Sequence, residues 1–396
     1  MKFCSDERGQ SLQVGAVLLF GFIVLALTIF QAEAVPEENK QVEFDHSQEV
    51  AEDMVRLYGA VFDTVVDGEP RTVSITLGTD YNDRLFFIYP PPASGALQTT
   101  EPRQLQFHNV TAVEDPDTNQ SFDNYWNNTT RRYDTQAITY SPNYRELRGT
   151  ADYRLEYGVL AAQYSDSEIT QPRIADSHQP IINDTDDDTV TEITLVVIDG
   201  DLQQISPDTE PVIPDRVTDS TTIRVTNATN TSSITLRLPT GLSKAMWNTS
   251  NPNSILYNQP AVADISVNGG VAEIQLDAIT EDGSARPYDL TLHKVDVGIN
   301  ATAPTPHYLR NVSYNGTHAT FGVRDEFNDR VDRPVDGWVY NGSNNETAED
   351  DFEIIDGQRT YNTTGLSDSS LCFTIEEDEV NASAYETIDI NGGCSS

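Results

Sequence analysis

Cysteine is scarce in this sequence of 396 residues, which holds only three of them. That number excludes a framework of several disulfides, and no Cys-x-x-Cys pair is present that could bind zinc or carry out redox chemistry. The six histidines are scattered without a His-Glu-x-x-His pattern, and neither a Gly-x-Ser-x-Gly elbow nor a phosphate-binding glycine loop occurs. We therefore expect no cofactor, no metal and no enzymatic activity. A hydrolase assembled from dispersed carboxylates is the alternative.

Positive charge is scarce as well. Lysine and arginine together number 24 against 63 acidic residues, which gives a net charge of −39, and only four of the basic residues are lysine. Such a chain repels itself strongly at low ionic strength, whereas at about 1 M salt the Debye length is only about 3 Å. The composition favours a protein of a hypersaline medium over an acidic surface protein from moderate salt. It argues against nucleic acid as a partner.

One long segment carries no charge at all. Residues 9–32 are uncharged, and residues 14–30 are almost wholly apolar. As a helix, the uncharged run is about 36 Å long, enough to cross a hydrocarbon core of roughly 30 Å. Lys2 and Arg8 precede the run, and acidic residues dominate after it. Positive residues favour the cytoplasmic side, so we expect a single-pass membrane segment with the N-terminus inside and the C-terminal domains outside.

A secretory signal is the alternative interpretation of the same segment. Ala32, Glu33 and Ala34 satisfy the small-x-small cleavage rule, so cleavage after Ala34 would release a soluble secreted glycoprotein. The apolar run exceeds the 7–15 residues usual for a signal peptide, and this favours a retained helix.

Glycosylation sequons are frequent, and all of them follow the apolar run. Fifteen Asn-x-Ser/Thr sites without an intervening proline are present, as an exported glycoprotein would carry. They are Asn109, Asn119, Asn127, Asn128, Asn183, Asn227, Asn230, Asn248, Asn300, Asn311, Asn315, Asn341, Asn345, Asn362 and Asn381.

Two cysteines lie beyond the membrane segment. Cys372 and Cys394 are close to the C-terminus, and an oxidising exterior permits a disulfide between them. Such a bridge would stabilise the terminal loop by roughly 3 kcal/mol on the chain-entropy model. Two unpaired buried thiols are the alternative.

A second helix is predicted over residues 36–67. Pro36 is expected to kink or interrupt the helical run. Apolar residues then recur with helical spacing, and Asp67 and Gly68 provide a stop signal. The apolar residues are Val50, Met54, Leu57, Val61 and Val65, with Glu49, Glu52, Asp53 and Arg56 between them.

The remainder is predicted to be mainly β. Short runs rich in Val, Ile, Thr, Tyr and Phe alternate with turn residues, which favours a β-sandwich ectodomain over residues 70–299. The expected strands are residues 72–77, 85–89, 105–112, 153–160, 192–198, 221–226, 233–238 and 271–278, with a helix start at 242–247. Asp184, Asp186 and Asp188 are spaced like the start of a calcium loop, but the glycine and the closing glutamate of such a loop are absent. A solvated acidic loop is favoured.

A Pro- and Thr-rich linker at residues 300–306 marks a boundary before a small domain at residues 306–396. In this last part, a predicted strand that bears an aspartate leads through a turn into a Val-x-Gly strand. The residues of this pattern are Val323, Asp325, Asn328, Pro334, Val335 and Gly337. The pattern resembles bacterial Ig-like modules of the invasin type, and the resemblance implies a small Ig-like sandwich.

At the N-terminus, Arg8 and Gly9 are followed directly by Gln10, Ser11 and the apolar run. This pattern resembles the class III signal of archaeal type IV pilins and pilin-like proteins. It implies a leader at residues 1–9, cleavage between Gly9 and Gln10, and a pilin-like helix at residues 10–34. Residues 11–39, 43–54 and 84–102 also resemble large haloarchaeal pilin-like surface proteins.

The expected function is therefore non-enzymatic. The chain is larger than a major pilin, which favours a minor pilin-like or adhesive surface glycoprotein of a halophilic archaeon. The expected partners are the membrane and other pilin-like helices, and the extracellular ligand is unknown.

Overall fold

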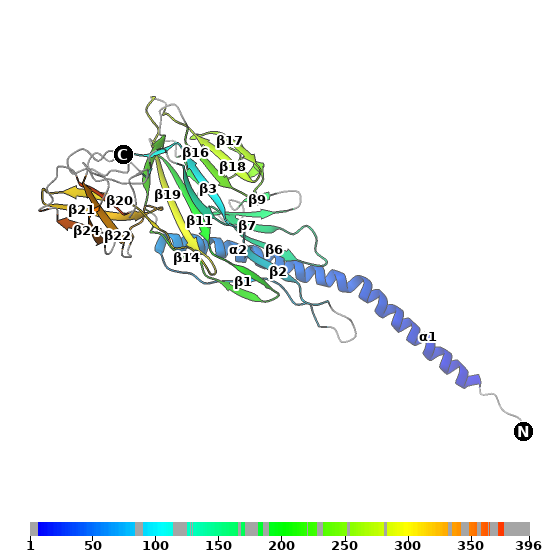
Figure 1. Cartoon of the computed structure of the whole chain (residues 1–396). Helices are drawn as coiled ribbons and strands as arrows, with labels where there is room; N and C mark the ends of the chain where they lie inside the picture. Colours follow the sequence, from blue (N-terminus) through cyan, green and yellow to red (C-terminus); the bar gives the residue numbers. More distant parts are fainter. Residues whose placement is uncertain are drawn as a thin grey trace, which may run out of the picture.

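A helical rod projects from a mainly β head in this computed structural model (Figure 1). The N-terminal end of the rod is far from the head, and the C-terminal strands lie at the opposite end of the molecule (Figure 1). The structure describes residues 7–83, 90–113, 125–126, 128, 130–164, 168–170, 181–184, 190–219, 221–227, 233–251, 254–280, 283–331, 335–341, 348–354, 358–362, 364 and 371–375.

The rod consists of two helices joined without a break. α1 (Glu7–Ile29) passes through a π-helical turn, η1 (Phe30–Ala34), into α2 (Val35–Asp67). At 1.5 Å per residue, α1 is about 35 Å long. Gly68 ends α2 with a left-handed φ of 77° and donates its N–H to Thr64 O, which confirms the predicted stop.

Pro36 does not interrupt the rod. Proline lacks an N–H, and its ring clashes with the carbonyl four residues earlier, here that of Ala32. The π-helical turn immediately before it widens the helix, with the Val35 N–H donating to Phe30 O. The expected kink is thus a local change from α to π geometry, after which the helix resumes.

Two parallel strands form the centre of the head. β11 (Thr191–Asp199) pairs with β19 (Tyr288–Asp296) over nine residues of each strand. Parallel strands are favoured where both faces are covered. Accordingly, Ile193, Leu195 and Val197 enter one hydrophobic core, and Val196 and Ile198 enter another. Their sheet also includes β4 (Val110–Ala112), β10 (Ile182–Asn183), β14 (Asp215–Arg216) and β15 (Ile223–Asn227).

The first core lies between the central sheet and a five-stranded antiparallel sheet. Leu105, Phe107 and Ile274 of this second sheet pack with Ile193 and Leu290 of the first, which makes the predicted β-sandwich. The strands of the second sheet, in spatial order, are β17 (Val262–Asn268), β18 (Val271–Leu276), β16 (Thr235–Pro239), β3 (Arg103–His108) and β5 (Arg131–Thr135).

The second core lies under α2. Val50, Met54, Leu57, Val61 and Val65 are all buried there, which confirms the predicted amphipathic helix. They pack on the other face of the central sheet and on further antiparallel strands. These strands belong to a six-stranded sheet and to the pair β1 (Val73–Thr76) and β13 (Thr209–Val212). The strands of the six-stranded sheet, in spatial order, are β12 (Gln203–Ser206), β2 (Ser94–Thr99), β6 (Ile138–Asn143), β7 (Asp152–Glu156), β8 (Val159–Gln163) and β9 (Glu168–Thr170).

Three local predictions need correction, and one falls outside the described residues. The expected strand at 153–160 is a hairpin, because Tyr157 and Gly158 take φ values of 54° and 83° and turn β7 into β8. Asn109, with a φ of 59°, divides the expected strand at 105–112 into β3 and β4. Residues 242–247 contain a short 3₁₀ helix, η3 (Lys244–Trp247), and residues 85–89 lie outside the described residues.

The C-terminal region forms two small facing sheets. Val323 and Phe321 of one sheet pack with Val335 and Ile354 of the other, in agreement with the expected small sandwich. One sheet contains β20 (Pro306–Tyr314), β21 (His318–Asp325) and β24 (Gln358–Asn362), and the other β22 (Val335–Asn341), β23 (Ala348–Ile354) and β25 (Leu371–Thr374). The resemblance to invasin-type modules stays a prediction, and Pro334 lies outside the described residues.

The turn that follows β21 is inserted into the head. Tyr308 and Phe327 belong to the first core although both lie beyond the linker. Tyr133 donates its hydroxyl to Glu326 O at 2.7 Å, and Asp329 Oδ1 accepts the Thr221 N–H at 3.1 Å. The small C-terminal sandwich is thus attached to the head by side chains as well as by the chain itself.

Candidate membrane anchor and its junction with the head

The half of the rod that projects from the head is apolar and uncovered. Every side chain from residue 13 to residue 30 is exposed, including Leu18 at 68% and Phe22 at 74%. Removing apolar surface from water is favourable by roughly 25 cal/mol for each Å². An exposed apolar surface of this length marks an interaction site for lipid or for other protein.

The same segment satisfies the requirements of a hydrocarbon environment. By length and composition, the apolar part of this helix, from Gln13 onward, could cross a membrane. Thr28 donates its hydroxyl to Val24 O at 2.8 Å, so this polar group is paired within the helix. All backbone groups of a spanning segment must be satisfied internally, and an uninterrupted helix achieves that.

Glu43 attaches the N-terminal part of α2 to the head. Its side chain is fully buried, and its carboxylate accepts the backbone N–H groups of Arg145, Glu146 and Leu147 at 2.8, 2.9 and 2.6 Å. Tyr81 donates its hydroxyl to the same carboxylate. The negative charge is thus compensated by four donors from two distant segments, and the loop that follows β6 is held against the helix.

His46 and Asp53 bind one residue of β1. His46 Nε2 lies 3.0 Å from Thr76 O, and Nδ1 lies 2.5 Å from the hydroxyl of Tyr144. A carbonyl can only accept, so Nε2 carries the proton and Nδ1 accepts from Tyr144. Burial lowers the pKa of His46, so the ring is neutral at pH 7. Asp53 Oδ2 accepts the Thr76 N–H at 2.8 Å, and burial raises the pKa of this carboxyl.

Sequence reasoning missed these attachment residues. Asp53 was expected between the apolar positions, and Glu43 and His46 were given no role. A signal was present, because Asn39, Glu43 and His46 precede Val50 at spacings of four, three and four. Polar residues that continue an apolar stripe lie on its face, so they are buried when that face is covered.

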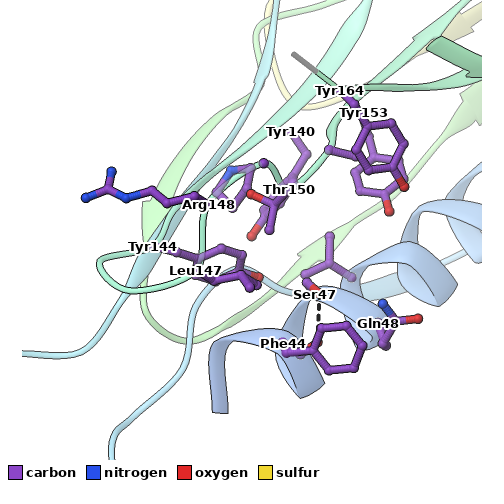
Figure 2. A pocket seen from close by; sticks show the side chains of 14 residues that line it. Phe44, Ser47, Gln48, Tyr140, Tyr144, Leu147, Arg148, Thr150, Tyr153 and Tyr164 are labelled. Atoms are coloured by element: carbon purple, nitrogen blue, oxygen red, sulfur yellow. Dashed lines mark hydrogen bonds between the residues drawn. The ribbon is translucent and has the colours of Figure 1, made fainter. Parts of the chain in front are cut away.

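A small aromatic recess lies beside this junction (Figure 2). It has a volume of about 310 Å³ between α2 and the strands β6 and β7. Phe44 comes from the helix, and Tyr140, Tyr144, Tyr153 and Tyr164 come from the β head, while the Arg148 side chain points away (Figure 2). Burial raises the pKa of Tyr153 to about 12, so its hydroxyl stays protonated at neutral pH. The recess offers apolar surface and hydroxyl groups.

The predicted processing site lies in α1. Gly9 and Gln10 are helical residues in its first turn, where the backbone alone is described. The predicted disulfide stays a prediction, since Cys372 is placed in β25 but Cys394 lies outside the described residues.

The asparagines of the sequons differ in whether the side-chain amide nitrogen Nδ2, to which a sugar would be attached, is hydrogen-bonded or buried. Asn109 and Asn183 donate Nδ2 to Ser233 O and to Glu192 Oε2, and Asn300 donates to Asp201 Oδ2. Asn227 is buried. By contrast, three exposed asparagines turn Oδ1 toward the backbone N–H two residues later and have no partner for Nδ2 among the described residues. These are Asn248, Asn315 and Asn362.

The other sequons add less to this comparison. Asn128 is exposed. Asn311 and Asn341 are described by their backbone alone, in β20 and β22. Asn119, Asn127, Asn230, Asn345 and Asn381 lie outside the described residues.

The histidines stay separate in the fold. His46, His108, His293, His307 and His318 lie on α2, β3, β19, β20 and β21, and His178 lies outside the described residues. Within the described part of the chain, no group of three or more His, Cys, Asp or Glu side chains could hold a metal ion.

Comparisons with known proteins add a partial match. A protein of Archaeoglobus fulgidus described as uncharacterized is 31% identical over 93 residues, which is 24% of this chain. The match spans 16% of the length of that protein. No family model matches the chain, and no solved structure matches it.

Proposed function

We propose that this chain is a membrane-anchored surface protein of the pilin-like kind, with α1 in the membrane and the β head outside the cell. The observation that carries the proposal is the row of exposed apolar side chains from residue 13 to residue 30. Twelve Leu, Ile, Phe and Val residues lie between residues 14 and 30. At about 0.3–0.6 kcal/mol each on the insertion scale, they favour the membrane by roughly 4–7 kcal/mol.

The division of the rod supports a pilin-like arrangement. α2 is fixed to the head by a hydrophobic core and by Glu43, His46 and Asp53. The head therefore moves together with the rod. α1 can exchange its contacts with lipid for contacts with similar helices without any change in the head. Lys2 and Arg8 before the apolar segment favour an internal N-terminus.

The proposed role is structural or adhesive and non-enzymatic, in a halophilic archaeon. The net charge of −39 suits a concentrated salt medium, and the sequons suit an exported glycoprotein. The partial match to an archaeal protein is in keeping with this source. A large head on one helix fits a minor subunit or a solitary tethered protein.

N-terminal sequencing of the native protein, combined with cell fractionation, tests the proposal. We expect a mature chain that begins at Gln10 and is recovered with membranes or with sheared filaments. Recovery with filaments would identify a pilus subunit, and recovery with membranes alone would identify a solitary anchor. A chain that begins at Val35 and is found free in the medium would overturn the proposal in favour of a secreted glycoprotein.

A further inference from the structure

A buried lysine lies at the end of the central parallel pair. Lys294 on β19 is only 6% exposed, and its Nζ is 2.8 Å from Asp199 Oδ2 on β11. The ammonium group also donates to Thr302 O. Asp199 is held in turn by the N–H groups of Gly200 and Thr302, at 2.8 and 2.9 Å. Amine and carboxyl are therefore fixed in contact.

A second carboxyl stands beside this pair. Asp296 is the register partner of Asp199, and neighbouring strands lie about 4.8 Å apart. Lys294 precedes Asp296 by two residues, so all three side chains leave the sheet on one face. Asp296 Oδ1 is buried and has no hydrogen-bond partner among the described residues. Burial raises the pKa of Asp296 to about 6, so it can hold or release a proton near neutral pH.

The choice of lysine at this site is unusual for the chain. The ion pairs Arg224–Asp289, Arg286–Asp184 and Arg154–Glu156 all use arginine, which forms two parallel hydrogen bonds and is always charged. Lysine is a poorer partner for a carboxylate, but a neutral amine is a nucleophile. Only four lysines occur in the sequence, and Lys294 is the buried one of the three that the structure describes.

We propose that Lys294 and Asp199 condense into an amide bond that joins β19 to β11 covalently, with Asp296 as the proton carrier. The proposal stands apart from the function proposed above.

The condensation balances without an oxidant or another reactant. A proton passes from the ammonium to the carboxylate, which leaves a neutral amine and a neutral acid. The Lys294 Nζ then attacks Asp199 Cγ, and the Gly200 N–H stabilises the charge that develops on Oδ1. Asp296 accepts a proton from the attacking nitrogen and gives it to Oδ2. The Cγ–Oδ2 bond breaks, and one water molecule leaves. Fixed contact removes the entropy cost of bringing the groups together.

The experiment is the intact mass of the full chain, purified in detergent at molar salt from a host without N-glycosylation, and measured after denaturation. We expect the folded protein to be lighter than its sequence by one water molecule. Fragmentation of a protease digest should show one branched peptide that joins Lys294 to Asp199. The Lys244→Arg control, at an exposed lysine, should keep the mass deficit.

Two variants exclude other sources of the deficit. Lys294→Arg and Asp296→Asn should each restore the full mass, and the second of them keeps both reacting groups. Because Asp199 precedes Gly200, a succinimide would also lose one water, but it would persist in both variants and yield no branched peptide. That result, or a full mass for wild-type protein with the circular dichroism of a folded β protein, would overturn the proposal.

Discussion

Removal of the Glu43 carboxylate should loosen the attachment of the rod to the head. In Glu43→Gln, one carboxylate oxygen becomes an amide nitrogen, which cannot accept the N–H groups of Glu146 and Leu147. Hydrogen bonds to a charged group contribute about 1.5–3 kcal/mol each, and a buried donor left unpaired costs about 1–3 kcal/mol. We expect Glu43→Gln to lower the free energy of unfolding by about 3 kcal/mol. Glu43→Ala, which leaves all four donors unpaired, should lower it by about 4–5 kcal/mol.

Urea unfolding of the full chain in detergent at molar salt, followed by circular dichroism, measures the change. Limited trypsin digestion locates it, because Arg145 and Arg148 lie in the loop that Glu43 holds and should be cut faster in the variant. Glu52→Gln, at an exposed position of the same helix, is the matched control and should stay within about 0.5 kcal/mol of the wild type. Equal stability and equal cleavage of Glu43→Gln and Glu52→Gln would refute the reasoning.

Three further predictions concern the anchor, the C-terminal joint and the sugars. Leu19→Arg should disfavour membrane insertion by about 3–4 kcal/mol and shift the chain to the soluble fraction after alkaline extraction, whereas Leu19→Ile should not. Burial raises the pKa of Asp325 to about 7, and the charges of Asp329 and Glu326 contribute to this. The folded state then binds more protons than the unfolded state between about pH 4 and pH 7, so stability falls as pH rises through that window. Asp325→Asn keeps an oxygen for the N–H groups that Asp325 accepts. It should be more stable than wild type at pH 8 by about 4 kcal/mol, and the difference should disappear near pH 4 in urea unfolding. Glycopeptide mass spectrometry should find sugar on Asn315 and none on Asn227, and the reverse occupancy would contradict the assignment by amide state.

The parts of the fold that depend on residues close together in the sequence could be predicted from the sequence. The uncharged run and the spacing of Val50, Met54 and Leu57 specify the rod and its packed face, because both signals lie within one helix. The continuous apolar stretch of β11 is likewise typical of a strand covered on both sides.

The junction could not be predicted, because its partners are distant along the chain. The carboxylate of Glu43 meets loop N–H groups about a hundred residues later, and backbone donors leave no trace in the residue types of that loop. Lys294 and Asp199 are brought together by the parallel register of two strands, which sequence patterns do not determine. At the hairpin between β7 and β8, Tyr157 takes a positive φ. This conformation is uncommon for residues other than glycine, so a tyrosine does not predict it.

The insertion of Phe327 and Tyr308 into the head has a consequence for how the chain can be divided. The linker near residue 300 resembles a place where a module could be cut away or exchanged, but both aromatic rings lie beyond it and complete the core before it. Deletion there would open a void beside Tyr125 and Tyr133, which pack on these rings. Part of the C-terminal sandwich therefore closes the core of the head. A graft or truncation should leave residues 306–331 in place.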